Sequence, residues 1–278
     1  MKRVFTTLSI LTALFLFSCQ KEAGFSGSDN GGGSNGGGLL KKLVSKSGSD
    51  SSVLAFGYNS SQKIITLNTT ITSGGTSTLI QERAERNAQG IIQKIIIKSN
   101  QYQQLGLDSV TTVMQYSSGR YTTKVTTFDL TVFVFKDSVE LIYDAAGKVI
   151  TEKSYTDYGS ASYRQTGKID YTYSGNNLAT IKNYTYDVSS ASYALDETYT
   201  YDQYDNKISP MFAGNEAFVF DSPFFYSSNN PTKSTYTLTG NPTQNYTITY
   251  TYNAANKPLT ASSDIQPGNI TSTGTYYY

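Results

Sequence analysis

The sequence predicts an all-β domain, a large antiparallel meander of about seven hairpin repeats curled into a barrel-like sheet. Three observations support this fold class. A turn motif recurs about every 28 residues, aromatic and polar residues alternate with period two around it, and no stretch beyond the N-terminal apolar run shows helical periodicity. Repetition at a fixed length indicates stacked supersecondary units.

Each repeat combines a tyrosine, a four-residue turn ending in Gly or Asn, and a strand that starts with Lys and an aliphatic residue. Residues 143–150 (YDAAGKVI) are the clearest copy, and residues 252–257 repeat it. Consecutive copies start 27 to 30 residues apart, except that the last follows after 51 residues. The seven starts are Tyr58, Arg86, Tyr116, Tyr143, Tyr173, Tyr201 and Tyr252.

The turn residues have a physical role. Asp or Asn at the first position of a type I turn, such as Asp144, accepts hydrogen bonds from the backbone that follows. Gly or Asn at the fourth position, such as Gly147, tolerates the left-handed conformation that lets a hairpin continue. Quartets 87–90, 174–177 and 253–256 meet both demands. Each unit is therefore predicted to be a hairpin of two strands of about ten residues.

Alternation around the turns predicts strands with one packed and one water-facing side. In residues 246–252 every Tyr and Ile falls on one face and every Thr on the other, and residues 169–173 repeat the pattern. Seven such units give roughly 12 to 16 strands, more than the ten or so that an open twisted sheet usually holds. We therefore expect the sheet to curl on itself and hide its edges. The polar outer face favours a tethered barrel over one that spans a membrane.

The 51-residue interval contains aromatic residues without steady alternation. We interpret residues 209–230 as a plug or lid against the apolar face of the sheet; the alternative is two irregular strands of the same meander. This insertion is the one break in the repeat, and recognition usually lies on such connecting segments. A ligand is therefore expected to meet Phe212, Phe218, Phe220, Phe224, Phe225 and Tyr226.

The N-terminus is typical of an exported lipoprotein. Residues 1–18 combine Lys2 and Arg3 with an apolar run too short to span a membrane, and Cys19, the single cysteine, closes it. We expect Cys19 to be lipidated; the alternative is an ordinary secretory signal with an incidental cysteine. Residues 19–38 then form the lipidated Cys and a flexible Gly/Ser linker, and residues 39–278 form the hairpin-repeat domain.

Residues 143–150 resemble the YD repeats of wall-associated and toxin-associated bacterial proteins. With the lipoprotein start, residues 39–278 resemble a family of Bacteroidetes lipoproteins of unknown function that has a porin-like fold, and residues 227–233 match a recurring feature there. Lys21 and Glu22 resemble the tag that directs such proteins to the cell-surface face of the outer membrane; the alternative is a solvated linker. Ser109 and Ser138 lie in triplets that resemble the Bacteroidetes O-glycosylation signal. The resemblance implies no catalytic residues.

Composition excludes several kinds of catalytic site. The chain has no histidine, which removes the Ser-His-Asp and Cys-His routes and the commonest zinc ligand. Asp202 and Asp205 can pair for glycan hydrolysis or bind calcium, but capping a turn is the simpler interpretation. Four charged residues of one segment are interpreted as a solvated cross-strand pattern. They are Glu82, Arg83, Glu85 and Arg86. We expect no catalytic residue, metal site or cofactor.

Partners follow from charge and aromatic content. Without residues 1–18 the net charge is −1, so nucleic acid is not an expected partner. The 24 tyrosines suit both a sheet core and stacking on sugar rings. The sequence favours a non-enzymatic envelope lipoprotein that binds or scaffolds a glycan or a partner protein, held to the membrane by its lipid. A carboxylate-dependent glycan hydrolase and a purely structural envelope component are the alternatives.

Overall fold

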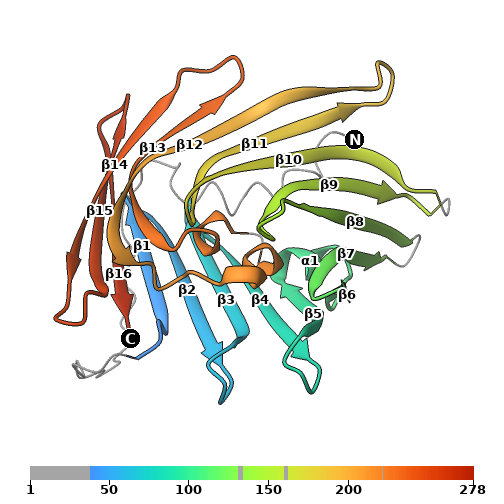
Figure 1. Ribbon diagram of the computed structural model, residues 1–278, viewed down its shortest axis with the longest axis horizontal. Coiled ribbons are helices and arrows are strands. Elements are labelled where there is room, and N and C mark those ends of the chain that lie inside the picture. The colour runs from blue at the N-terminus through green and yellow to red at the C-terminus, as the bar shows by residue number, and fades with distance from the viewer. Residues whose placement is uncertain (1–37, 131–133, 160–161, 221) are drawn as a thin grey trace.

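The fold is a closed barrel of 16 antiparallel strands (Figure 1). The computed structural model describes residues 38–278 apart from 131–133, 160–161 and 221. Every strand pairs with its neighbours in the chain, and β1 (Lys42–Ser47) pairs with β16 (Ile270–Tyr277) to close the ring. The predicted curled meander is confirmed, with a strand count at the top of the predicted range.

The other strands follow in chain order, with a long connection between β12 and β13. They are β2 Asp50–Tyr58, β3 Ile64–Ser73, β4 Thr76–Arg86, β5 Ile92–Ser99, β6 Val110–Ser117, β7 Arg120–Asp129, β8 Val134–Tyr143, β9 Val149–Asp157, β10 Arg164–Ser174, β11 Asn177–Asp187, β12 Ser192–Ile208, β13 Asn229–Leu238, β14 Gln244–Tyr252 and β15 Pro258–Gln266. A five-residue helix, α1 (Asn100–Gln104), begins after Ser99, whose hydroxyl accepts from the Gln101 amide. No helix in the described part of the chain is long and apolar enough to cross a membrane.

The turns that start at Asn87, Asp144 and Asn253 form as their residues predict. Quartet 174–177 does not, because Ser174 pairs with Asn177 and Gly175 takes the left-handed conformation instead of Asn177. Asp144 accepts from the Lys148 amide through its side chain (2.8 Å) and from the Gly147 amide through its carbonyl (3.1 Å). Gly147 has a φ of 81°, the left-handed conformation that glycine tolerates. The same bonds close the turn that starts at Asn87 and the one that starts at Asn253. In each of these turns, a capping side chain at the first position and a left-handed residue at the fourth therefore end one strand and allow the next to begin.

The copy that starts at Tyr201 departs from the prediction, because no hairpin turn forms there. Strand β12 runs through it to Ile208, and its pairing with β13 shifts register three times. The Asp205 carboxylate accepts from the backbone and the side-chain amide of Asn230 on β13 (3.1 and 3.0 Å). These tertiary bonds hold the segment against the neighbouring strand, and the chain leaves the sheet after it.

The alternation predicts which side chains face the lumen. On β14, Tyr246 is buried while Thr247 and the other two threonines of the strand are exposed, as predicted. On β3, Leu67 and Thr69 are buried, and the positions between and around them carry Thr and Asn. The outer faces of these two strands are therefore polar, the reverse of strands that face lipid.

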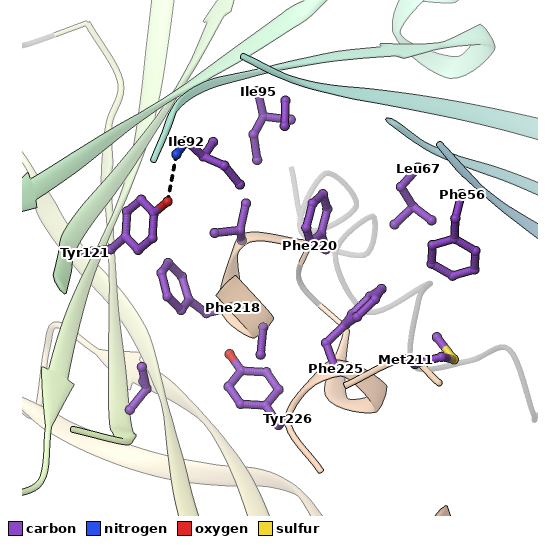
Figure 2. Packing of buried hydrophobic residues seen from close by; sticks show 14 of the residues in the cluster. Phe56, Leu67, Ile92, Ile95, Tyr121, Met211, Phe218, Phe220, Phe225 and Tyr226 are labelled. Atoms are coloured by element: carbon purple, nitrogen blue, oxygen red, sulfur yellow. Dashed lines mark hydrogen bonds between the residues drawn. The ribbon is translucent and has the colours of Figure 1, made fainter. Parts of the chain in front are cut away.

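The connection between β12 and β13 folds into the barrel as a plug, defined here as residues 209–228. It contains two 3-10 turns, η3 (Gly214–Phe220) and η4 (Pro223–Phe225), drawn in orange inside the ring of strands (Figure 1). Figure 2 shows Phe218, Phe220 and Phe225 packed between wall residues of several strands. The predicted plug is confirmed, and the alternative of two irregular strands does not form.

Candidate functional site

An ion pair fastens the plug to the wall of the barrel. The Arg86 guanidinium on β4 donates to both carboxylate oxygens of Glu216 on η3, at 2.7 and 2.8 Å. Arg86 also donates to the carbonyls of Gly90 and Ile64, and its side chain is 6% exposed. The prediction of a solvated charge pattern is therefore wrong for Arg86. It describes Arg83 and Glu85, an exposed pair at 2.7 Å.

A second polar cluster ties the plug to the wall from another direction. Glu152 on β9 accepts from the hydroxyls of Tyr171 on β10 (2.8 Å) and Tyr226 of the plug (2.9 Å). Lys124 lies 3.9 Å from the Glu152 carboxylate and donates to the carbonyl of Phe218 (3.2 Å). Burial, then the nearby Glu152 carboxylate, raises the pKa of Tyr226 well above its usual value. These charges serve to hold the plug.

The plug leaves one side of the lumen unfilled. The space is partly open to solvent and lies between the plug and the wall of β1, β2 and β12 to β16. None of the described residues around it carries a charge. We call it the lumen cavity. Its lining includes four tyrosines and seven serines: Tyr201, Tyr204, Tyr250, Tyr276, Ser45, Ser52, Ser209, Ser222, Ser227, Ser263 and Ser272.

Two of these tyrosines are held in place through their hydroxyls. Tyr204 donates to the Leu178 carbonyl at 2.8 Å, and Tyr250 donates to the Pro231 carbonyl at 3.0 Å. Burial raises the pKa of Tyr204 to about 12 and also raises the pKa of Tyr250. The rings are therefore fixed and uncharged at neutral pH, with their faces forming part of the cavity wall.

The structure separates the aromatic residues that were predicted to meet a ligand. Phe218, Phe220 and Phe225 are at most 2% exposed and Tyr226 is buried, so these four fill the lumen. Phe224 lines the lumen cavity, and Phe212 is exposed at 45%. A contact with ligand stays a prediction for all six, and the placement favours Phe224.

The structure describes two of the three predicted modification sites. Ser109 is half-buried in the connection before β6, and Ser138 is half-buried within β8. Cys19 lies outside the described residues. Modification of the three residues stays a prediction.

The two aspartates considered for hydrolysis have different surroundings. Asp202 is exposed, whereas Asp205 is half-buried and accepts from four donors: the Lys207 amide, both nitrogens of Asn230 and the Tyr252 hydroxyl. In the described ranges, no three His, Cys, Asp or Glu side chains gather in a way that can hold a metal ion. Asp205 thus serves to fasten the end of β12, a structural use of its carboxylate.

The sequence missed the residues that anchor the plug. The strand alternation that turns Ala84 inward also turns Arg86 inward, so the sequence pattern of β4 could have indicated that Arg86 is buried. Lys124, Glu152 and Glu216 gave no comparable signal, because a charged residue in a strand or connection is usually solvated.

Comparison with known proteins supports the fold. A scan against protein-family models finds no match, and a search of the curated proteins finds none either. Two solved porin-like proteins are similar in structure, one from Bacteroides uniformis ATCC 8492 (12% identity, TM-score 0.53) and one from Bacteroides vulgatus ATCC 8482 (15% identity, TM-score 0.52). Each comparison covers 86% of this chain and 97% or 98% of the other. At this identity the likeness concerns the fold.

Proposed function

We propose that this protein is a non-enzymatic module of the bacterial envelope that holds a glycan or part of a partner protein in its plugged barrel. The observation that carries the proposal is the lumen cavity. It is uncharged along its described lining, rich in Tyr and Ser, and backed by a plug. The Arg86–Glu216 ion pair and the hydrogen bonds from Lys124 and to Glu152 hold that plug in place. Aromatic faces combined with hydroxyls suit binding of neutral polar ligands.

The envelope location rests on the N-terminal sequence together with the fold. Residues 1–18 resemble a lipoprotein signal, and Cys19 is placed to receive the lipid. The structural similarity to porin-like Bacteroides proteins agrees with an envelope role. Polar outer faces on β3 and β14 suit a barrel that stands in water at the end of a linker. The proposal therefore places the protein on the outer membrane, facing the cell exterior.

A carboxylate-dependent glycan hydrolase is the second candidate. Such an enzyme needs one carboxyl group free to give a proton and another free to attack or to activate water. Asp205 and Glu152 are each engaged by several donors, which argues against this use. The double variant Asp202→Asn and Asp205→Asn distinguishes the two functions. If the protein is a hydrolase, the folded double variant no longer cleaves its glycan. If the protein is a binding module, the folded double variant still binds its ligand.

A glycan array combined with a pull-down from envelope extracts, using the full chain, tests the proposed function. Binding of a glycan class or of one envelope protein, without release of shortened glycan, supports it. Release of shortened glycan favours the hydrolase. Absence of any ligand in both screens favours a purely structural component and contradicts the proposal.

A further inference from the structure

One part of the barrel wall is made of small residues. Across five adjacent strands, paired positions that face the lumen read Ser52, Ser45, Gly274, Ala261 and Tyr250. The next inward row holds Ser47, Ser272, Ser263 and Ile248. Elsewhere the lumen side of the wall carries larger residues that pack on the plug. The lumen cavity lies where the serine, glycine and alanine side chains of these rows are too short to reach the plug.

Hydroxyl groups in this wall are buried without a hydrogen-bond partner. Ser52, Ser263 and Ser272 line the lumen cavity, are 3% or 4% exposed, and have no partner for Oγ. Buried polar groups in native proteins are nearly always hydrogen-bonded, so each exception calls for an explanation. Three such hydroxyls lie on one cavity wall, and each is able to hydrogen-bond with a ligand there once a change of χ1 rotamer turns it toward the cavity.

Gly274 is the second sign of a ligand in this wall. A glycine inside a strand weakens it and often marks a place where a ligand approaches closely. A Cβ at this position would lie 3.6 Å from its nearest neighbours, the side chains of Ala261 and Leu43, which is ordinary contact. Packing within the barrel therefore does not require a glycine here. The space above Gly274 belongs to the cavity.

We propose that Ser263 and Ser272, with Gly274 in the adjacent row and Phe224 on the plug side, form a subsite for one neutral sugar ring. The inference deepens the proposed function and rests on it. Ser263 and Ser272 are paired across β15 and β16, so their hydroxyls meet adjacent hydroxyls of the same ring. Phe224 supplies an aromatic face for the apolar side of the sugar.

The absence of charge along the described lining decides the ligand class. An anionic sugar or a phosphate needs a cation or several amide donors to offset its desolvation. No Lys or Arg lines the lumen cavity among the described residues; Lys124 and Arg86 hold the plug. A purely aliphatic ligand leaves the serine hydroxyls without partners. A neutral, hydroxylated ring satisfies both conditions.

Saturation-transfer NMR with the full chain and a panel of methyl glycosides of neutral hexoses, each paired with its uronic acid, tests the subsite. The variants are Ser263→Ala with Ser272→Ala, Gly274→Leu, and the control Ser47→Ala. Ser47 is also a buried hydroxyl without a partner in the same wall, and it does not line the cavity. The thermal midpoint of each variant is measured by circular dichroism.

The subsite predicts that at least one neutral glycoside binds and that its uronic acid binds at least tenfold more weakly. The serine double variant binds about tenfold or more weakly, because two hydrogen bonds to the sugar are lost. Gly274→Leu abolishes binding because its side chain occupies the cavity, and Ser47→Ala binds normally. The serine variants keep or raise the thermal midpoint, because they remove buried hydroxyls without partners.

Three results overturn the proposal, and they are distinguishable. If a glycoside binds wild type and Gly274→Leu alike, the ligand lies elsewhere, and the proposed function stands while the subsite falls. If the uronic acid binds equally well, the neutral class is wrong. If no glycoside binds wild type, the subsite falls, and the glycan array and pull-down then decide the proposed function separately.

Discussion

Arg86 on β4 and Glu216 on η3, 130 residues apart in the chain, form a two-point ion pair that fixes the plug inside the barrel. Arg86 is buried and has two backbone carbonyls as further acceptors, so its position is set by the wall. Glu216 comes from the segment that interrupts the repeat. This pair therefore links a strand of the hairpin repeat to the plug, the segment that interrupts the repeat.

Replacing Glu216 with Ala leaves a buried guanidinium without its carboxylate. Removing one partner of a buried pair typically costs about 3–5 kcal/mol. Because Glu216 is partly exposed, we expect a loss near the lower end of this range. Unfolding in guanidinium chloride, followed by circular dichroism, measures this loss of stability. The control is Glu85→Ala, which breaks the exposed pair with Arg83 and should cost about 1 kcal/mol or less. Equal losses in the two variants would contradict a plug anchored through Arg86.

Tyrosine burial makes the fold sensitive to alkali. Burial raises the pKa of Tyr58, Tyr121 and Tyr143 to about 12, whereas an unfolded tyrosine ionises near 10. Above pH 10 the unfolded chain therefore releases protons that the folded chain retains, so stability falls as pH rises from 10 towards 12. We expect part of the tyrosinate absorbance to appear only together with the loss of β-sheet circular dichroism. Full tyrosinate absorbance from a chain that keeps its circular dichroism would exclude this coupling.

Replacing each of two strand glycines with alanine should have different effects on stability. A Cβ on Gly167 would lie 2.6 Å from the Tyr184 carbonyl oxygen, so β10 and β11 must move apart. We expect Gly167→Ala to cost about 1–3 kcal/mol through overpacking. Gly274→Ala has only contacts of 3.6 Å or more, and we expect it to be neutral or slightly stabilising. Thermal unfolding of the two variants, measured in parallel, tests this order. The reverse order would mean that the wall near Gly274 is already filled.

Lipid anchoring is tested by Cys19→Ala in the full chain. The variant lacks the thiol that receives the lipid, so we expect export but no stable attachment, and the protein moves from the membrane pellet to the soluble fraction. Fractionation with an immunoblot measures the distribution, and Ser18→Ala is a control that keeps the cysteine. A Cys19→Ala variant that stays in the membrane pellet would show that something other than this lipid holds the protein.

The regular part of the fold could be predicted because its signals are local. Asn87, Asp144 and Asn253 cap their own turns, and alternation in β14 sets which side chains face inward. The copy at Tyr201 has similar turn residues and forms no hairpin. Its outcome depends on Asp205 reaching Asn230, a partner in another strand. Local sequence does not contain that information.

The candidate site could be predicted in outline only. The break in the repeat located the plug, and Phe224 within it lines the lumen cavity. Whether an aromatic ring fills the lumen, as Phe220 does, or borders a cavity depends on the size of the residues across from it. Ser263 and Ser272 drew no attention in the sequence, because short polar residues are frequent in these strands. Their significance comes from the absence of partners in the folded wall.

A crystal structure of the full chain with the tightest-binding neutral methyl glycoside tests the central claim most directly. We expect one sugar ring in the lumen cavity, on the face of Phe224, with its hydroxyls within hydrogen-bond distance of Ser263 and Ser272 Oγ. A glycoside bound on the outer surface, while the lumen cavity contains only water, would contradict it.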